Sequence, residues 1–353
     1  MASKARQLAQ SASAPEGRKN ILINGAMQVA QRATSVTGVS GSGYHTVDRF
    51  DTSMTSDGRY TQSQVTDAPE GFGHALKFDC TTADTSIAAG ENLIGLFQIE
   101  GQDVQTIQKG TSSAKEVTVS FYAKANAAKT YVCELKDFTN TRTCSKTFTV
   151  GTSYARHEIT FPADTTGAIT SDNARQFAIN LWLHAGSTYT SGTLQTAWGA
   201  QSNADRAVGI DSFFSSTDNT FFITGVQLEV GSVATEFEHR SFGEELALCQ
   251  RYFQKSYNQS VALGTATNVG ITVGVRGNGA FTMTAHLKET MRATPTAVAY
   301  SPVSGASGKV RDLEGGDDES ATITASESTI HFTGTGSNVS NAYSVHHTAD
   351  AEL

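Results

Sequence analysis

The chain has 353 residues with a formal net charge of −8, and only 17% of its residues are charged. Its lysines and arginines form no basic stripe, so we expect no nucleic-acid partner. Apolar runs are only a few residues long, which argues against a secretory signal and against membrane insertion. The chain is longer than a typical domain with a single hydrophobic core, so we expect two folded domains and a short extension.

The composition favours β-structure. Glycine occurs 32 times and proline only 5 times, serine and threonine are abundant, and 18 phenylalanines supply enough apolar surface for a packed core. The four cysteines lack the close paired spacing of a zinc site, so we expect small core hydrophobes and no cofactor. A disulfide between Cys133 and Cys144 across a hairpin is the alternative, which a cytosolic site of assembly disfavours.

Residues 1–19 are rich in Ala, Ser and Gln and show no strand alternation. We expect an extension that is held only by a neighbouring protein. The pattern changes at Asn20, and Met27 and Val29 then follow the alternation of a half-buried strand. The first domain is therefore predicted to begin at residue 20.

Short β-rich runs, separated by turn clusters, recur between residues 44 and 230. The alternation is clearest in 176–184, where one face carries four apolar residues and the opposite face carries Ala178, Asn180, Trp182 and His184. About ten strands without a helical period between them predict an all-β fold, with a jelly-roll β-sandwich over residues 20–240. The best strands are expected at 117–125, 131–136, 155–161, 176–184 and 221–230.

A helix is predicted after the sandwich, because Ser241 and Glu244 have the spacing of a capping box. Leu246, Cys249 and Phe253 then recur at spacings of three and four, which gives one apolar stripe along a connecting helix at 241–257. Alternation returns at 269–275 and 281–285. Residues 258–353 are therefore expected to form a smaller C-terminal β domain.

Two stretches carry a recognisable pattern: NILINGAMQVAQR at 20–32 leading to YHTVDRF at 44–50, and ITGVQLEVGSVATEFEHR at 223–240. Together with SFGEELALCQRYFQK at 241–255, they resemble a family of phage tail proteins common in phages of marine bacteria and cyanobacteria. The jelly roll of that family is similar to carbohydrate-binding modules. Glu236 stands where the motif at the end of the family's module has proline. This difference affects the local turn and not the resemblance.

The resemblance implies a virion component, namely a tail fibre or receptor-binding subunit assembled in the host cytoplasm. It also implies a homotrimer, docking on phage tail proteins through residues 1–19, and binding to host surface polysaccharide or lipopolysaccharide. A purely architectural tail-adaptor or capsid-decoration subunit is the alternative. The helix stripe, with Leu246, Cys249 and Phe253, is the candidate oligomer interface, although packing on its own domain would use the same residues.

Sugar binding uses aromatic platforms flanked by polar groups, so candidate residues are expected on the strand faces opposite the predicted core. Trp182, with His184 and Asn180 beside it, and Tyr122 on the run 117–125 are the glycan-binding candidates. The competing interpretation is that Trp182 lies beneath a loop or a neighbouring subunit.

No catalytic or metal-binding residues are predicted. His346 and His347 are adjacent and would face opposite sides of a strand, so we expect surface residues rather than a metal site. A polysaccharide depolymerase would need two carboxylates across a cleft. No spacing selects such a pair among Asp48, Glu91, Glu134, Glu158 and Glu229. We therefore expect a protein that is not an enzyme.

Overall fold

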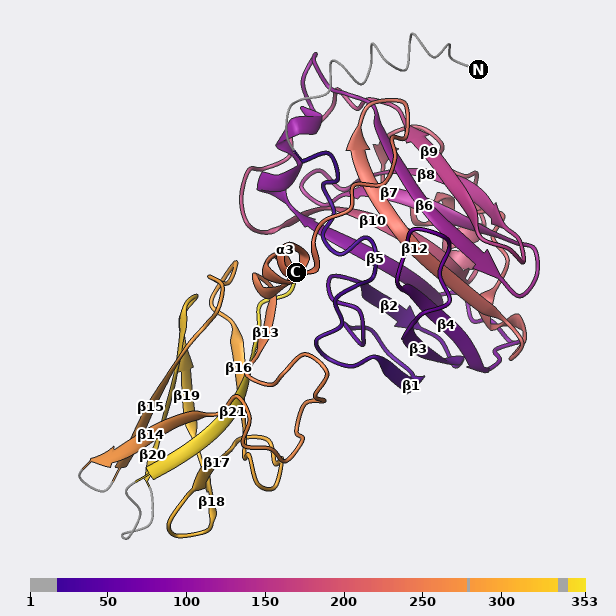
Figure 1. The fold of residues 1–353 in the computed structure, drawn as a ribbon. Coiled ribbons are helices and arrows are strands. Elements are labelled where there is room, and N and C mark those ends of the chain that lie inside the picture. The colour runs from indigo at the N-terminus through magenta and orange to yellow at the C-terminus, as the bar shows by residue number, and fades with distance from the viewer. Residues whose placement is uncertain (1–17, 278–279, 336–341) are drawn as a thin grey trace.

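The computed structural model describes residues 18–277, 280–335 and 342–353. Two β bodies are joined by one short helix (Figure 1). The larger body contains the strands up to Val230, and the smaller one contains the strands from Phe253 onward. No helix in these described ranges is long and apolar enough to span a membrane. The extension predicted at 1–19 lies outside the described residues up to position 17.

The larger body is a sandwich of two six-stranded sheets in which all pairs are antiparallel. The first sheet has the order β1 (Ser35–Val39), β3 (Arg59–Val65), β4 (Ala75–Thr82), β12 (Thr220–Val230), β6 (Val117–Ala125), β9 (Ala155–Phe161). The second has the order β11 (Gly199–Ala200), β8 (Arg142–Val150), β7 (Lys129–Asp137), β10 (Arg175–Ala185), β5 (Asn92–Glu100), β2 (Asp51–Thr55).

Alternating side chains build the core between these sheets. Phe177, Ile179 and Leu181 of β10 point into it, as do Val119 and Phe121 of β6 from the facing sheet. Such inward alternation from both sheets is what a sandwich requires. The predicted all-β, jelly-roll class is therefore confirmed, with a helix and a smaller β domain after the sandwich.

Short helices and loops cover parts of the sandwich. The segment after β10 crosses the outer face of the second sheet before the chain returns to β12. The four short helices of the sandwich are η1 (Gly101–Ile107), α2 (Ser187–Thr190), η2 (Asn203–Asp205) and η3 (Phe213–Ser215).

The strand predicted around Met27 and Val29 is wrong. This segment is irregular, and Asn24 and Met27 have φ angles of 60° and 56°. Asn24 takes the place of a strand partner: its side chain donates to the carbonyls of Val29 and Asp48 at 2.8 and 2.9 Å and accepts from the Val29 amide. Met27 and Val29 are both buried, but they lie in an irregular segment and not in a strand. Their alternation with less apolar neighbours therefore reflects burial alone.

The connecting helix is shorter than predicted. It spans α3 (Phe242–Gln250), and the Ser241 side chain accepts from the Glu244 amide as its N-cap. Phe253 already belongs to β13 (Phe253–Lys255), which pairs with β21 (Ala342–Asp350). The predicted end at residue 257 is wrong because the apolar spacing continues across the helix end into this strand, where tertiary pairing decides the conformation.

The smaller body is a nine-stranded antiparallel assembly organised around β21. Its own core contains Phe281, Met283, Phe332 and Tyr343. The remaining strands are β14 (Thr272–Gly277), β15 (Ala280–His286), β16 (Thr296–Tyr300), β17 (Lys309–Asp312), β18 (Asp318–Ser320), β19 (Thr322–Ala325) and β20 (Thr329–Thr335).

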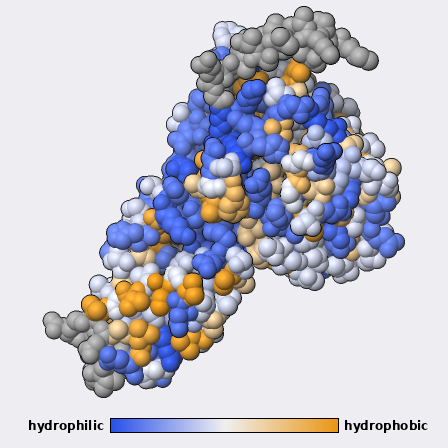
Figure 2. All heavy atoms as spheres, in the orientation of Figure 1, coloured by the Kyte–Doolittle hydropathy of each residue, from blue (hydrophilic) through white to orange (hydrophobic). Residues whose placement is uncertain are grey.

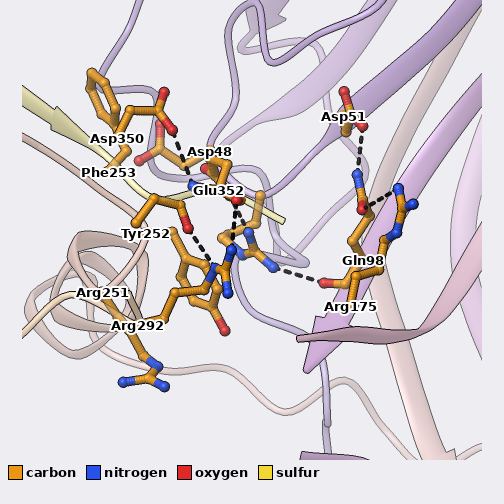
Figure 3. Close-up of polar contacts among 12 residues, drawn as sticks. Asp48, Asp51, Gln98, Arg175, Arg251, Tyr252, Phe253, Arg292, Asp350 and Glu352 are labelled. Atoms are coloured by element: carbon orange, nitrogen blue, oxygen red, sulfur yellow. Dashed lines mark hydrogen bonds and ion pairs between the residues drawn. The ribbon is translucent and has the colours of Figure 1, made fainter. Parts of the chain in front are cut away.

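Buried arginines join the two bodies. Residues 350–352, the last residue of β21 and the two that follow, return to the helix and face the first loops of the sandwich (Figures 1 and 3). Arg32 pairs with Asp350 at 2.9 Å, and Arg49 forms an ion pair with Glu352. Burial raises the pKa of the Glu352 carboxyl, against the effect of both guanidinium groups. The junction is thus a polar network between segments about 300 residues apart in the sequence.

The four cysteines are buried and free, as expected for small core residues. Cys133 and Cys144 form no disulfide, although β7 and β8 are paired. Burial raises the pKa of the Cys144 thiol to about 11, which keeps it protonated and unreactive.

Candidate functional site

Trp182, the first glycan-binding candidate, is fully buried. Its ring lies 5.0 Å from that of Tyr189, and Ala207 and Leu194 pack into the same small cluster. The Arg206 guanidinium covers the ring at 4.7 Å. The segment after β10 therefore lies over this face, and Trp182 cannot stack on an external sugar. The platform prediction is wrong for this residue, and the competing interpretation of a covering loop is correct.

Asn180 and His184 are buried on the same face. Asn180 donates to Glu134 at 2.6 Å, and Arg206 binds the same carboxylate through two nitrogens. His184 contacts Glu91 and Ser212. Neither side chain is available to a ligand outside the sandwich, because Asn180 is 1% exposed and His184 is not exposed at all. These two glycan-binding predictions are wrong for the same reason as that of Trp182.

Tyr122, the remaining candidate, lies half-buried on the outer face of the other sheet. The ring of Phe72 lies 5.3 Å away in a tilted arrangement, and those of Phe237 and His239 lie 5.1 Å from Phe72. Phe72 comes from the loop between β3 and β4, and the other two from the segment after β12. Three separate segments thus gather four rings over β6.

A bulge in β12 makes room for these rings. The pairing of β12 with β6 shifts register between Thr224 and Gln227, and Gly225 in that interval has a φ of 63°. A Cβ atom at this position would lie 2.6 Å from Phe72 and 3.0 Å from Tyr122. Only glycine combines this left-handed backbone with such a close approach.

The rings continue along the same sheet face through Phe222 and Tyr154. The Lys124 amine lies 4.7 Å from the Phe222 ring centroid and 4.6 Å from that of Tyr154. It also pairs with Asp67 at 2.8 Å, whose backbone carbonyl accepts from the Tyr154 hydroxyl at 2.6 Å. We use the name aromatic surface for this set of half-buried or exposed rings: Phe72, Tyr122, Tyr154, Phe222, Phe237 and His239.

Charged pairs border the aromatic surface. Lys77 pairs with Asp79 at 2.8 Å on β4, and Arg156 with Glu158 at 3.0 Å on β9. Lys77 and Arg156 therefore stand on the strands flanking β12 and β6. The exposed parts of such rings can stack on the apolar face of a pyranose, while the neighbouring charged groups hydrogen-bond its hydroxyls.

The sequence indicated only part of this surface. Phe222 has a detectable signal, since it alternates with the core residues Phe221 and Ile223 along β12. Phe72 and Phe237 lie in irregular segments where no period shows which way a side chain points. Their place beside Tyr122 depends on tertiary packing.

A polar groove of about 430 Å³ lies beside η1, apart from the aromatic surface. The Lys109 amine at its edge already pairs with Asp137 at 2.5 Å and Asp164 at 3.0 Å. The groove is lined by Val104, Gln105, Gln108, Lys109, Thr111, Ser113, Ala168 and Ile169. It has amide and hydroxyl groups but no aromatic ring, so it lacks the stacking element that the aromatic surface offers.

The five carboxylates considered for catalysis have separate partners. Asp48 lies near Arg32, Glu134 pairs with Arg206, and Glu158 with Arg156. Glu229 accepts from the side chain and amide of Thr235, and Glu91 lies beside His184. Each carboxylate belongs to its own local network.

The apolar stripe of the predicted helix is used within the chain. Cys249 is fully buried, and Phe253 is 3% exposed under the Arg32 guanidinium. These two residues cannot contact another subunit directly, which corrects their assignment to an oligomer interface. Leu246 is half-buried and stays a prediction.

His346 and His347 are also buried, so the surface positions expected for them are wrong. The His346 ring stacks on Tyr257 at 3.8 Å and contacts Ser256 through Nδ1. Both faces of β21 are covered in this domain, which is why neighbouring histidines on opposite faces are both enclosed.

The sequence matches no family model, and a comparison with curated proteins finds no match. Among solved structures, the chain is similar to the carbohydrate-binding module CBM4, with 11% identity and a TM-score of 0.31 over 59% of this chain and 99% of the module. A family 11 module from Clostridium thermocellum, in complex with a mixed-linked tetrasaccharide, gives 11% identity and a TM-score of 0.28 over 59% and 99%.

A third similar structure is the enzymatically active domain of tailspike protein 4 from bacteriophage CBA120. It is 11% identical, with a TM-score of 0.29 over 52% of this chain and 19% of the tailspike chain.

Proposed function

We propose that this chain is a non-enzymatic subunit of a phage tail fibre that binds host surface glycans through the aromatic surface. The observation that carries the proposal is the gathering of rings around Tyr122, beside the pairs Lys124–Asp67 and Lys77–Asp79. A chain that only needed to close its sheet would cover these rings, as it covers Trp182 on the other sheet. The sequence resemblance to phage tail proteins supports the virion role.

Adhesion through such a surface works by stacking and repetition. Tyr122, Phe222 and Tyr154 are half-buried, so part of each ring is exposed to a sugar, and the charged pairs beside them offer donors and acceptors to sugar hydroxyls. One contact of this kind is weak. Several copies on one fibre raise the effective concentration of the next contact, so that avidity exceeds the affinity of a single site by a factor on the order of 10² to 10⁴.

Self-association of the chain, which the resemblance implies as a homotrimer, is part of the proposal. Hydrophobic side chains gather on the smaller body (Figure 2). On β14, Val273 and Val275 are 56% and 70% exposed. On one side of β14, the described outward residues of β15, β20 and β19 include no Asp, Glu, Lys or Arg: Thr282, Thr284, Thr322, Thr324, His331 and Thr333. On the other side the same face ends at the Arg311–Asp318 ion pair of β17 and β18. Depletion of charge is typical of the centre of an interface.

Light scattering tests this part of the proposal. Wild type is expected to be a trimer, and the double variant Val273→Asp/Val275→Asp is expected to be a monomer because it places charges on that face. A monomeric wild type, or an unchanged trimer in the variant, would contradict self-association through this face. Attachment to tail proteins through residues 1–19 is tested by deleting them, which should leave a folded oligomer that no longer joins tails.

The glycan proposal is tested with purified oligomer on intact host cells and on their isolated lipopolysaccharide. We expect saturable binding that Tyr122→Ala/Phe222→Ala abolishes without a change in oligomeric state. Phe138→Ala is the matched control, since Phe138 is also a half-buried ring flanked by cations, Lys136 and Arg175, but lies beside the other sheet. Equal binding by all variants would contradict the aromatic surface as the site.

The two alternatives have their own outcomes in the same assay. An architectural tail-adaptor or capsid-decoration subunit would show no saturable binding to cells or lipopolysaccharide. A depolymerase would release soluble sugar with time, which we measure in the same tubes. Binding without sugar release is the result expected for the adhesion subunit.

A further inference from the structure

Three buried side chains converge at one end of the sandwich. Asp84 follows β4 of one sheet, Glu91 precedes β5 of the other, and His184 lies near the end of β10. They are 6%, 7% and 0% exposed, respectively. One ligand atom from each, two carboxylate oxygens and an imidazole nitrogen, lie within 4.8 Å of one another.

The charge of this cluster is not balanced by any described lysine or arginine. Among the residues that the structure describes, the one ion-pair contact of either carboxylate is that of Glu91 with His184 Nε2 at 3.3 Å. Six other buried carboxylates in the described part of the chain are each paired with a cation. They are Asp48, Glu100, Glu134, Asp137, Asp164 and Glu245. Two buried carboxylates side by side without a cation are costly, because each opposes ionisation of the other.

Glu229 shows how the chain treats a buried carboxylate without a cation. It accepts hydrogen bonds from the Thr235 amide, the Thr235 hydroxyl and the Gln227 side chain. Three donors thus satisfy one carboxylate. In the cluster, Asp84 accepts from the Ser56 hydroxyl and the Ser86 amide. Glu91 has the Ala88 backbone and His184 as neighbours, and its carboxyl hydrogen-bonds to that of Asp84, so the two acids share one site.

The imidazole is oriented as in a metal site. His184 Nδ1 contacts the Ser212 hydroxyl at 2.8 Å, and the ring packs edge-on against Phe214 at 5.2 Å. Donation from Nδ1 to Ser212 leaves the Nε2 lone pair facing the two carboxylates. A second contact of this kind, on the nitrogen away from the metal, fixes ring and tautomer in metal sites.

We propose that Asp84, Glu91 and His184 bind a divalent first-row transition-metal ion, and that this ion is zinc. Zinc accepts a mixed set of imidazole nitrogen and carboxylate oxygens with water as the fourth ligand. Calcium and magnesium take oxygen ligands, and calcium takes six to eight of them, so the histidine and the small ligand number select against both. This proposal replaces the sequence-based expectation of no metal site, which rested on ligands spaced closely along the chain.

The role of the ion is structural. Asp84 also donates its amide to the Phe214 carbonyl at 2.8 Å, so the loop between β4 and β5 already touches the segment that carries Ser212. An ion at the cluster joins that loop to the end of β10 and so closes one end of the sandwich. The alternative is a proton shared between the two carboxylates, which needs no metal.

Calorimetric titration of the metal-stripped full chain with zinc chloride tests the proposal. We expect one zinc per chain and a rise in melting temperature that EDTA reverses. Asp84→Asn/Glu91→Gln should lose both effects, because the amide side chains bind zinc poorly. Glu229→Gln, the matched control, should keep both. No saturable binding by wild type, or unchanged binding by the double variant, would overturn the proposal in favour of the shared proton.

Cobalt(II) substitution of wild type gives a readout that does not depend on whether the variant folds. Nitrogen and oxygen ligands give visible d–d bands without thiolate charge transfer. A strong thiolate charge-transfer band would place the ion on the buried cysteines and would also overturn the proposal.

Discussion

The Arg49 guanidinium lies over the ring of Tyr252, with Cζ 3.5 Å from the ring centroid. Arg49 belongs to the first loop of the sandwich, whereas Tyr252 stands between α3 and β13. The same guanidinium pairs with Glu352 and donates to the Gln98 carbonyl at 2.7 Å. One arginine therefore connects the sandwich, the linker and the residues after β21, beside the contacts shown in Figure 3.

Replacing Arg49 with Met is expected to destabilise the protein by about 3 kcal/mol, because the buried Glu352 carboxylate loses one of its two guanidinium partners and keeps only Arg32 at 3.4 Å. The measurement is chemical unfolding, followed by fluorescence. Glu352→Gln is the control: the double variant Arg49→Met/Glu352→Gln should be more stable than Arg49→Met alone. If the unfolding free energies lost in the two single variants add up to the loss in the double variant, the two residues do not interact.

Replacing Trp182 with Ala is expected to cost about 3 to 5 kcal/mol of stability, since it opens a cavity beneath the segment that carries Tyr189 and Ala207. Glycan retention at temperatures where the variant is folded should stay at the wild-type level. The check is a melting curve together with the cell-binding assay. Loss of glycan binding with an unchanged melting temperature would show that Trp182 contacts the sugar directly.

Gly225→Ala should weaken glycan binding without touching any sugar contact directly. The added Cβ meets Phe72 and Tyr122, and alanine at this φ carries a further cost of about 1 kcal/mol. We expect a moderate fall in melting temperature and a larger fall in binding. Gly209→Ala is the control, since Gly209 also has a positive φ of 85° but an added Cβ meets nothing within 4 Å. Equal binding by the two variants would show that ring placement does not matter.

The sequence predicted the regular elements well, since alternation is a local property. The strands at 117–125 and 155–161 match β6 and β9 residue for residue, and the cap at Ser241 is as expected. Alternation along a strand does not predict which of the two outer sheet faces remains exposed to solvent. The face of β10 carrying Trp182 and the face of β6 carrying Tyr122 have the same pattern, and only the later segments that fold over one of them distinguish the two.

The proposed metal site of Asp84, Glu91 and His184 could not be predicted from the sequence for a similar reason. Glu91 was considered from the sequence only as a catalytic carboxylate, and His184 only as a sugar contact. They are 93 residues apart, and they meet because β10 runs antiparallel to β5, with His184 opposite Leu93. No motif spacing records such a meeting, since it depends on strand register.

The smaller body is expected to lose stability in acid through His347. Burial lowers the pKa of this imidazole to about 4, and the nearby charges of His346 and Lys288 act in the same direction. The unfolded chain, with a histidine pKa near 6.5, takes up the proton first. The stabilising effect of a neutral His347 is therefore complete above about pH 6.5 and is lost as the pH falls toward 4, by about 2 to 3 kcal/mol.

His347→Leu should flatten this acid dependence, because leucine does not titrate and the buried Nδ1 atom has no hydrogen-bond partner to lose. Unfolding free energies at pH 7, 5.5 and 4 measure the effect. His286→Leu is the control, since His286 is exposed on β15 of the same body and should keep the wild-type slope. If both variants follow the wild-type slope, acid destabilisation must come from other groups, and His347 must be able to accept a proton within the folded domain.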